Sequence, residues 1–232
     1  MNDVVQNTKL LNYLLEFISD NKRNKFDEII RHRTRYLTIV LEDIFQPHNT
    51  SAVLRSCDCF GIQDIHIIEN SNKYQVNPDV ALGSSKWLNL VQYNSSEHNT
   101  RNCLEQLKSK GYRIVATTPH KNGFTLDELP LDQKTALVFG TEMRGLTTEA
   151  LEMSDAFVKI PMYGFTESLN ISVSAALCLY HLTEKLRRSP VQWQLDETEI
   201  IETKLEWVRQ VIKNAYLIET RFLKEQYSCN SG

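Results

Sequence analysis

Residues 136–153 read ALVFGTEMRGLTTEALEM, and this stretch decides the class of fold. Its first four residues are apolar and have the length of a short buried strand. A loop bounded by Gly140 and Gly145 follows, and residues 147–153 then have the pattern of a helix. A strand, a short loop and a helix in this order are the repeating unit of proteins with a parallel sheet.

The same alternation continues on both sides of this stretch. We predict further strands at residues 36–41, 64–69, 112–117 and 156–160, a weaker one at 88–92, and helices at 50–60, 97–110 and 170–188. Strands as apolar as these are typical of a parallel sheet that is buried on both faces. The sequence therefore predicts an α/β domain, with helices covering both faces of the sheet, at residues 36–188.

The two ends of the chain have a different pattern. Residues 1–35 predict a basic helical N-terminal extension, and residues 189–232 predict a linker followed by a helix at 197–222. A single terminal helix cannot bury an apolar stripe by itself. We therefore expect the C-terminal helix to pack on the domain or on a partner subunit.

Composition limits the classes of protein that fit. The chain has 232 residues, with 26 Lys and Arg against 29 Asp and Glu, and 41% of its residues are hydrophobic. These values exclude a disordered chain and a uniformly basic nucleic-acid binder. Residues 21–35 nevertheless carry six basic and two acidic side chains. This run is either a solvated helix face or a surface that binds phosphate groups.

Several other kinds of protein are not expected. The N-terminus lacks the pattern of a signal peptide, and no apolar stretch approaches the roughly 20 residues of a membrane helix. The five cysteines include no C-x-x-C pair, so we expect neither a zinc site nor a disulfide framework. The sequence predicts a cytoplasmic protein that spans no membrane and holds no metal.

The loop at 140–147 resembles a phosphate-binding P-loop only in its glycine spacing. Leu146 stands where such a loop needs a lysine, and Glu142 places a carboxylate where phosphates would lie. We therefore reject the triphosphate-binding interpretation. A short loop with a glycine at each end, located where a strand ends, is still a position at which open α/β sheets bind ligands.

Two more polar segments follow predicted strands. Residues 46–55, QPHNTSAVLR, lead from the first strand into a helix that Asn49 or Thr50 can cap. Residues 160–176, IPMYGFTESLNISVSAA, lead from the last strand into the helix at 170–188. Because parallel strands end at the same edge, all three segments should meet there. This arrangement predicts a functional site.

These three segments resemble the motifs of the SpoU–TrmH family, which belongs to the SPOUT class of RNA methyltransferases. The first motif matches at 49–55 (NTSAVLR), the second at 137–146 (LVFGTEMRGL), and the third at 160–176. The resemblance implies a deep trefoil knot at the C-terminal side of the domain, S-adenosylmethionine as methyl donor, a homodimer with the site at the subunit interface, and no metal. It also implies methyl transfer to a ribose 2′-hydroxyl of RNA.

The resemblance implies roles for individual residues. The catalytic group would be Arg55, Asn49, Glu142, Ser168 and Asn170. The positions that hold the methyl donor, largely through backbone groups, would be Thr117, Gly140, Ile160 and Leu169. RNA would be bound by a basic set at both ends of the domain: Lys22, Arg23, Arg31, Arg33, Arg35, Arg187 and Arg188.

The layout of the chain indicates the substrate. Only about 35 residues precede the first strand, too few for an added RNA-binding domain. Helical extensions at both ends resemble the subgroup that methylates guanosine 18 in the D-loop of tRNA. The alternatives are another tRNA or ribosomal RNA nucleotide, or a knotted RNA-binding protein without catalytic activity.

Overall fold

The computed structural model describes residues 2–141 and 144–230, which form two compact units. The first, here called the sheet unit, is Thr34–Trp193. The second, here called the helical unit, joins the residues up to Arg33 with those from Gln194 onward. No helix in the described part of the chain is long and apolar enough to cross a membrane.

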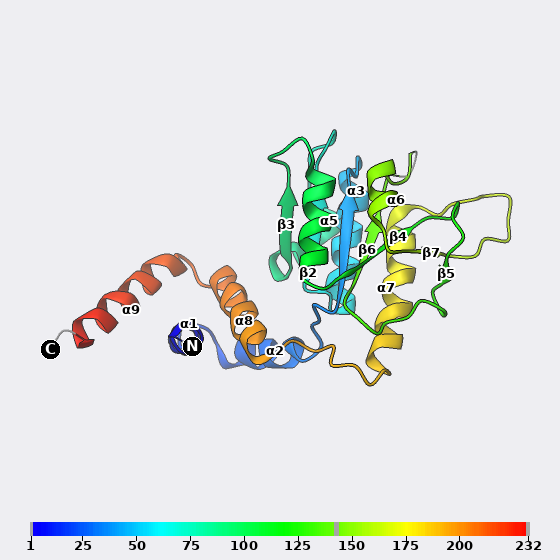
Figure 1. Ribbon diagram of the computed structural model, residues 1–232. Coiled ribbons are helices and arrows are strands. Elements are labelled where there is room, and N and C mark those ends of the chain that lie inside the picture. The colour runs from blue at the N-terminus through cyan, green and yellow to red at the C-terminus, as the bar shows by residue number, and fades with distance from the viewer. Residues whose placement is uncertain (1, 142–143, 231–232) are drawn as a thin grey trace. The chain divides into compact units, whose positions relative to one another are not determined.

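The sheet unit is built on seven parallel strands (Figure 1). Their order across the sheet is β3-β2-β1-β6-β4-β7-β5. The bounds are Leu37–Glu42 for β1, Asp64–Ile68 for β2, Asn89–Tyr93 for β3, Arg113–Thr117 for β4, Phe124–Thr125 for β5, Thr135–Phe139 for β6 and Ala156–Lys159 for β7. The six predicted strands are confirmed. The sequence missed β5, since two residues at a sheet edge carry too little periodicity to detect.

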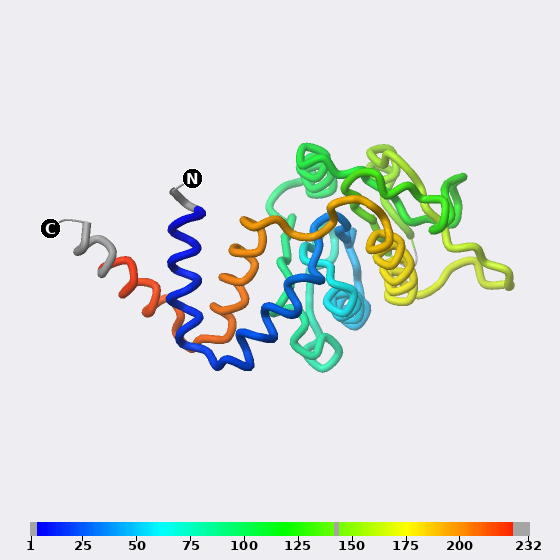
Figure 2. Tube along the Cα trace, turned by 90° about the horizontal axis from the view of Figure 1, so that it is seen from below, coloured from blue at the N-terminus to red at the C-terminus, as the bar shows by residue number. Residues whose placement is uncertain are grey.

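Four helices cover the two faces of this sheet. Pro47–Phe60 (α3) and Ile171–Arg187 (α7) lie side by side on one face, and Asn99–Ser109 (α5) and Thr148–Met153 (α6) lie on the other (Figure 2). Two short pieces, Pro78–Ala81 (α4) and the 3₁₀ turn Ser84–Trp87 (η1), connect β2 to β3. The predicted α/β architecture with two covered faces is therefore confirmed.

Alternation along the strands explains the two layers of core. In β6, Leu137 and Phe139 face α3 and α7, whereas Ala136 and Val138 face α5 and α6. All six residues of β1 are buried. A strand with both faces buried in this way is stable only at the centre of a parallel sheet, where helices replace solvent on each side.

The strand order also brings the predicted motifs together. The chain builds β1, β2 and β3 outward in one direction, and β4 then lies on the other side of β1, with β6 between them. Such a reversal leaves a crevice beyond the carboxyl ends of the strands, where α/β sheets bind ligands. The loops that follow β1, β4, β6 and β7 all leave the sheet at this edge.

The helical unit consists of four helices drawn from both ends of the chain. They are Asn2–Leu15 (α1), Asp20–Ile30 (α2), Glu197–Val211 (α8) and Ala215–Asn230 (α9). The prediction of one continuous C-terminal helix at 197–222 is wrong. The helix breaks after Val211 because Asn214 adopts a left-handed conformation with a φ of 56°. Asparagine tolerates that conformation better than most residues, so this break is local and is not visible in the apolar pattern.

The apolar stripe of α8 is covered by the N-terminal helices. Leu205, Trp207 and Val208 are buried, and the ring of Phe26 from α2 lies 5.4 Å from that of Trp207. Leu14 from α1 is also fully buried. The two ends of the chain therefore form one small core, which the sequence analysis treated as two separate extensions.

Candidate functional site

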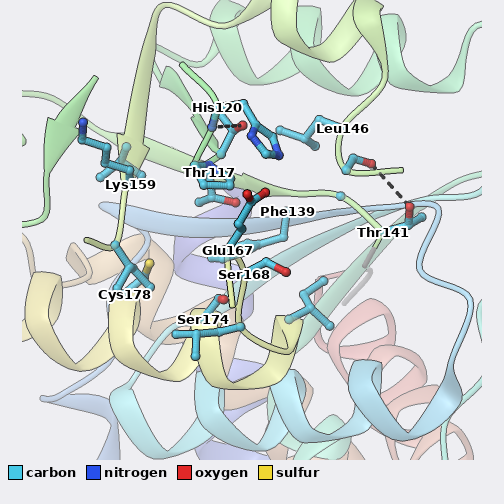
Figure 3. A pocket seen from close by; sticks show the side chains of 18 of the residues that line it. Thr117, His120, Phe139, Thr141, Leu146, Lys159, Glu167, Ser168, Ser174 and Cys178 are labelled. Carbon is cyan, nitrogen blue, oxygen red and sulfur yellow. Dashed lines mark hydrogen bonds between the residues drawn. The ribbon is translucent and has the colours of Figure 1, made fainter. Parts of the chain in front are cut away.

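A cavity of about 250 Å³ lies at the carboxyl edge of the sheet. Its walls come from the segments that follow β4, β6 and β7 and from the first turns of α7. All four residues predicted to hold a methyl donor line it: Thr117, Gly140, Ile160 and Leu169. Ser168 lines it as well. Figure 3 shows the side chains that surround this cavity.

The lining combines apolar and polar side chains. Phe139, Leu146, Val158 and Ile171 form apolar walls, while Glu167 is the one carboxylate among the lining residues that the structure describes. Figure 3 shows Glu167 and His120 directed toward the interior and the ammonium of Lys159 directed away from it. Burial raises the pKa of Cys178 to about 12, so this lining thiol stays protonated at neutral pH.

The two described ends of the loop after β6, Thr141 and Gly145, are held together. Thr141 and Gly145 pair through two backbone hydrogen bonds of 3.1 and 2.9 Å. A side chain at position 140 would place its first carbon 2.3 Å from the carbonyl of Gly145, which only glycine avoids. Gly145 itself has a φ of 67°, in the left-handed region. Both glycines of the second motif are therefore required by the backbone, independently of any ligand. Glu142 lies outside the described residues.

Asn49 of the first motif is buried and points to the third motif. The sequence predicts a capping role for Asn49 or Thr50, but α3 begins at Pro47, with Gln46 at the N-cap position. Asn49 therefore lies within the first turn of the helix. Its side-chain oxygen instead accepts a hydrogen bond of 3.1 Å from the amide of Asn170. Asn49 also donates to the side chain of Gln46, at 3.2 Å.

Asn170 has two roles at once. Its side-chain oxygen accepts hydrogen bonds from the backbone N–H and the hydroxyl of Ser172, at 2.9 and 2.6 Å, and thereby caps α7. Its amide nitrogen makes the bond to Asn49. The N-terminal turns of α3 and α7 are thus linked by one side-chain hydrogen bond between residues 121 positions apart in the sequence.

Arg55 lies on α3 and is exposed. Among the residues that the structure describes, none makes a hydrogen bond or an ion pair with its guanidinium. This is uncommon in the sheet unit, where Arg35, Arg101 and Arg113 all form ion pairs with carboxylates. A free guanidinium is available to an anionic ligand such as a phosphate group.

The residues predicted to bind RNA fall into two groups: side chains that are exposed to solvent and side chains that make contacts within the protein. Lys22 and Arg31 are exposed, and Arg188 is 81% exposed although it pairs with Glu184. Arg23 donates to the carbonyl of Leu15 at 2.6 Å and also pairs with Asp20. Among these residues, the three exposed ones present the most charge to solvent.

The remaining three residues of that set are used within the fold. Arg33 is 2% exposed and its guanidinium lies 5.4 Å from the ring centre of Trp207. Arg35 forms an ion pair with Asp64, both side chains being mostly buried. Arg187 donates to the carbonyl of Phe60 at 2.9 Å. Burial makes Arg33 unsuitable for an RNA contact, because a phosphate cannot reach its guanidinium without opening the small core.

One buried acid at this edge of the sheet was not predicted from the sequence. Glu42 ends β1, is 1% exposed, and accepts hydrogen bonds from Thr100 and Thr147. The available signal was a glutamate directly after five residues of an apolar strand, where the strand pattern predicts burial. The polar residues Glu167 and His120 were missed for a different reason, since they lie on loops without any periodicity.

The comparisons with known proteins agree with this geometry. The family model described as "SpoU rRNA Methylase family" matches residues 36–180. A "tRNA (guanosine(18)-2'-O)-methyltransferase" of Borreliella burgdorferi is 45% identical over 211 residues, which are 91% of this chain and 95% of that protein. A protein of the same name from Thermus thermophilus is 33% identical over 162 residues, 70% of this chain and 81% of its own length.

The fold is also similar to that of a solved relative. The crystal structure of the A. aeolicus TrmH/SpoU tRNA modifying enzyme superposes with a TM-score of 0.73 at 28% identity, covering 84% of this chain and 98% of the other. The family model covers more than half of the chain, and it includes the strands, loops and helices that build the cavity. The chain belongs to the SpoU methylase family of RNA methyltransferases.

Proposed function

We propose that this protein transfers a methyl group from S-adenosylmethionine to the ribose 2′-hydroxyl of guanosine 18 in the D-loop of tRNA. The family, and relatives bearing that activity in their names over nearly the whole chain, support the proposal. The observation that carries it is the hydrogen bond between Asn49 and Asn170, beside a cavity lined by the loops after β4, β6 and β7. The first and third motifs are thereby linked at one edge of the sheet.

The cavity has the chemistry that the methyl donor requires. S-adenosylmethionine combines a flat purine, a ribose and a charged amino acid, and supplies a methyl group that is already activated on a sulfonium. The apolar walls suit the purine, and we propose that backbone groups of the lining residues Gly140, Ile160 and Leu169 bind its polar edges. The carboxylate of Glu167 suits a ligand that carries positive charge.

The protein must then align a ribose hydroxyl and remove one proton. We propose that Asn49, held by Asn170, orients the substrate and the guanidinium of Arg55. An arginine is an awkward base, since a guanidinium keeps its proton up to about pH 12. Either an RNA phosphate positions Arg55 to accept the proton, or Arg55 only grips the phosphate and solvent takes the proton. Glu142 and Ser168 are proposed to complete the catalytic group.

We also propose the trefoil knot that the family resemblance implies. The loop at 140–147 and the segment at 160–170 both line the same cavity, and the latter returns from β7 to α7, which packs against α3. A chain that crosses back over the carboxyl edge in this way is placed to thread beneath the second-motif loop. An experimental backbone trace in which residues 160–176 pass outside that loop would contradict the proposal.

A homodimer with the site at the subunit interface is proposed as well. One face of α7 is apolar and exposed, at Val173, Leu177 and Tyr180, and the neighbouring third-motif loop exposes Tyr163 and Phe165. Exposed apolar groups of this size on one helix and its adjoining loop are typical of a subunit interface. Sedimentation analysis should give the mass of two chains. A single-chain mass at micromolar concentration would contradict the dimer.

The domain boundaries and the RNA-binding surface are further parts of the proposal. The methyltransferase domain is residues 36–188, which the family match and the sheet unit support.

RNA phosphates are bound by Lys22, Arg23, Arg31 and Arg188, with Arg35 and Arg187 as weaker contributors, and Arg33 is left out because it is buried. A protein that acts on tRNA in this way works in the cytoplasm.

The decisive test uses two matched substrates. A tRNA transcript with guanosine at position 18 and the same transcript with 2′-deoxyguanosine there are incubated with labelled S-adenosylmethionine. The proposal predicts label in the first and none in the second, followed by nuclease mapping to position 18. Label in ribosomal RNA alone would support the alternative substrate. RNA binding without binding of S-adenosylmethionine in calorimetry would support a non-catalytic protein.

A further inference from the structure

Glu42 is a charged side chain in an unusual place. It ends the central strand β1 and is 1% exposed. Among the described residues, no basic side chain lies within ion-pairing distance of its carboxylate. Burying a carboxylate is costly in free energy unless its oxygens accept hydrogen bonds. The donors of those hydrogen bonds therefore indicate which part of the structure Glu42 stabilises.

The partners of Glu42 belong to two different helices. One carboxylate oxygen accepts bonds from the hydroxyls of Thr100 and Thr147, each at 2.7 Å, and the other oxygen accepts the backbone N–H of Thr147 at 2.9 Å. Thr100 lies in the first turn of α5, and Thr147 is the N-cap of α6. Two of the three bonds therefore go to one residue, Thr147.

Thr147 is the point where the second-motif loop ends. Its hydroxyl also accepts the backbone N–H of Ala150, at 3.1 Å, and so fixes the start of α6. The other end of the loop is closed by the backbone pairing of Thr141 with Gly145. Gly145, which takes part in that pairing, and its neighbours Arg144 and Leu146 all line the cavity. The position of this cavity wall thus depends on the bonds between Glu42 and Thr147.

A neutral side chain cannot replace the carboxylate in this arrangement. The site presents three donors, and both carboxylate oxygens act only as acceptors. A glutamine would direct its NH₂ group at either the Thr147 N–H or the two hydroxyls. In either orientation at least one buried donor loses its acceptor. The carboxylate, unlike an amide of the same length, accepts all three bonds at once.

We propose that Glu42 is a positioning residue for the methyl-transfer site, which it serves by fixing the second-motif loop against the donor cavity. This inference rests on the proposed function, because it assigns the cavity to S-adenosylmethionine. Glu42 does not line the cavity. It acts through Thr147, and its loss should weaken donor binding by loosening the loop and not by removing a contact.

The test compares Glu42→Gln with the wild-type protein in two measurements. Calorimetry gives the dissociation constant for S-adenosylmethionine, and hydrogen exchange reports the opening of the Gly145 and Thr147 amides. Loss of one charge-assisted hydrogen bond predicts a rise of about tenfold in the dissociation constant, together with faster exchange of both amides. Affinity for tRNA without the donor should stay within about twofold, because the loop is expected to affect the donor site alone.

Glu69→Gln is the matched control. Glu69 lies at the same edge of the sheet and its carboxylate also accepts two hydrogen bonds, from the Tyr74 N–H at 2.9 Å and from Asn94 at 3.1 Å. Neither the acid nor these two partners line the donor cavity. The control should therefore lower the melting temperature without changing the dissociation constant for S-adenosylmethionine.

Thr147→Val provides a second variant if Glu42→Gln does not fold. It keeps the backbone bond to Glu42 and loses the hydroxyl, with its bonds to Glu42 and to the Ala150 N–H, so both measurements should change in the same direction as in Glu42→Gln. Wild-type donor affinity in Glu42→Gln, or an equal loss in Glu42→Gln and Glu69→Gln, would overturn the inference. Failure of the wild-type protein to bind S-adenosylmethionine would instead overturn the proposed function, and the exchange data would still show whether Glu42 holds the loop.

Discussion

Two arginines from the two units show how position decides what a charged side chain does. Arg55 on α3 of the sheet unit is exposed, and no described residue pairs with its guanidinium. Arg33, three residues beyond the end of α2 in the helical unit, is 2% exposed and stacks on Trp207. Composition and helical periodicity describe both only as basic residues within or near a predicted helix, and the family motif at 49–55 alone distinguishes Arg55.

The difference lies in what surrounds each residue. The carboxyl edge of a parallel sheet cannot be covered by its own crossover helices, so side chains there remain available for ligands. The helical unit is small, and it must use long side chains as well as apolar ones to exclude water from its core. Arg55 is therefore expected to contribute to activity and little to stability, and Arg33 the reverse.

The largest effect should come from Arg55→Ala. Removing a group that positions or deprotonates the hydroxyl should lower kcat by about 10³-fold, within the usual range for general acid–base and electrostatic catalysis. The free energy of unfolding should change by less than about 0.5 kcal/mol, since the side chain is exposed and unpaired among the described residues. Single-turnover methylation and thermal unfolding measure the two quantities. Near-normal turnover would contradict both proposed roles.

Arg55→Lys separates the two roles of this residue. A lysine can bind a phosphate and gives up its proton more readily than a guanidinium does. If Arg55 is the base, the pH–rate profile should shift to lower pH in the variant. If Arg55 only grips a phosphate, the profile should keep its shape while the rate falls at every pH.

The bond between Asn49 and Asn170 should give the next largest effect. Asn170→Asp keeps the oxygen that caps α7 and loses the amide that donates to Asn49. Turnover should fall about 10²-fold, because misplacing a catalytic group by 1 Å can have that cost. The stability should stay close to that of the wild-type protein.

Asn170→Ala is the control for that change. It loses the cap as well and should be destabilised by about 1 kcal/mol more than Asn170→Asp. Equal stability of the two variants would show that the cap contributes nothing. Wild-type turnover in Asn170→Asp would show that the bond to Asn49 does not position the site.

The sequence predicted the sheet well because the signal is local and repeated. Every strand of four or more residues except β3, which was predicted more weakly, appears as an apolar run, and the glycines that end helices and bound loops are visible directly. The three polar segments could be placed at one edge from the strand direction alone. The contact between Asn49 and Asn170 could not be predicted from the sequence, because it joins the first turns of two helices that lie 121 residues apart.

The errors have two physical causes. The break at Asn214 and the start of α3 before Asn49 are each decided by the backbone of a few residues, which apolar periodicity does not report. The burial of Arg33 and of Glu42 depends on elements far away in the sequence, Trp207 for the first and Thr147 for the second. Arg33 was assigned to the RNA-binding set because of its charge, and tertiary packing places it inside.

A change at Arg33 should affect stability and leave turnover per folded molecule unchanged. Arg33→Ala removes the stacking on Trp207 and leaves a gap in the small core of the helical unit, at a cost of about 2 kcal/mol. Arg33→Met keeps most of the apolar stem and should recover part of that loss. Urea unfolding followed by tryptophan fluorescence measures both variants. A stability equal to that of the wild-type protein would contradict the packing role.

The smallest effect should come from Arg31→Ala, which compares an exposed arginine of the helical unit with the buried Arg33. Arg31 lies two residues before Arg33 but is exposed. If it contacts an RNA phosphate, its loss should lower tRNA affinity by only a few fold near 0.1 M salt and reduce the slope of log affinity against log salt by about one.

Arg101→Ala removes the same charge from an exposed arginine of α5 that is already paired with Glu149. Net charge alone would change the slope equally in both variants, whereas a phosphate contact changes it only for Arg31. An unchanged slope in Arg31→Ala would remove Arg31 from the proposed RNA-binding set, and the phosphate contacts of the helical unit would then have to come from Lys22 and Arg23.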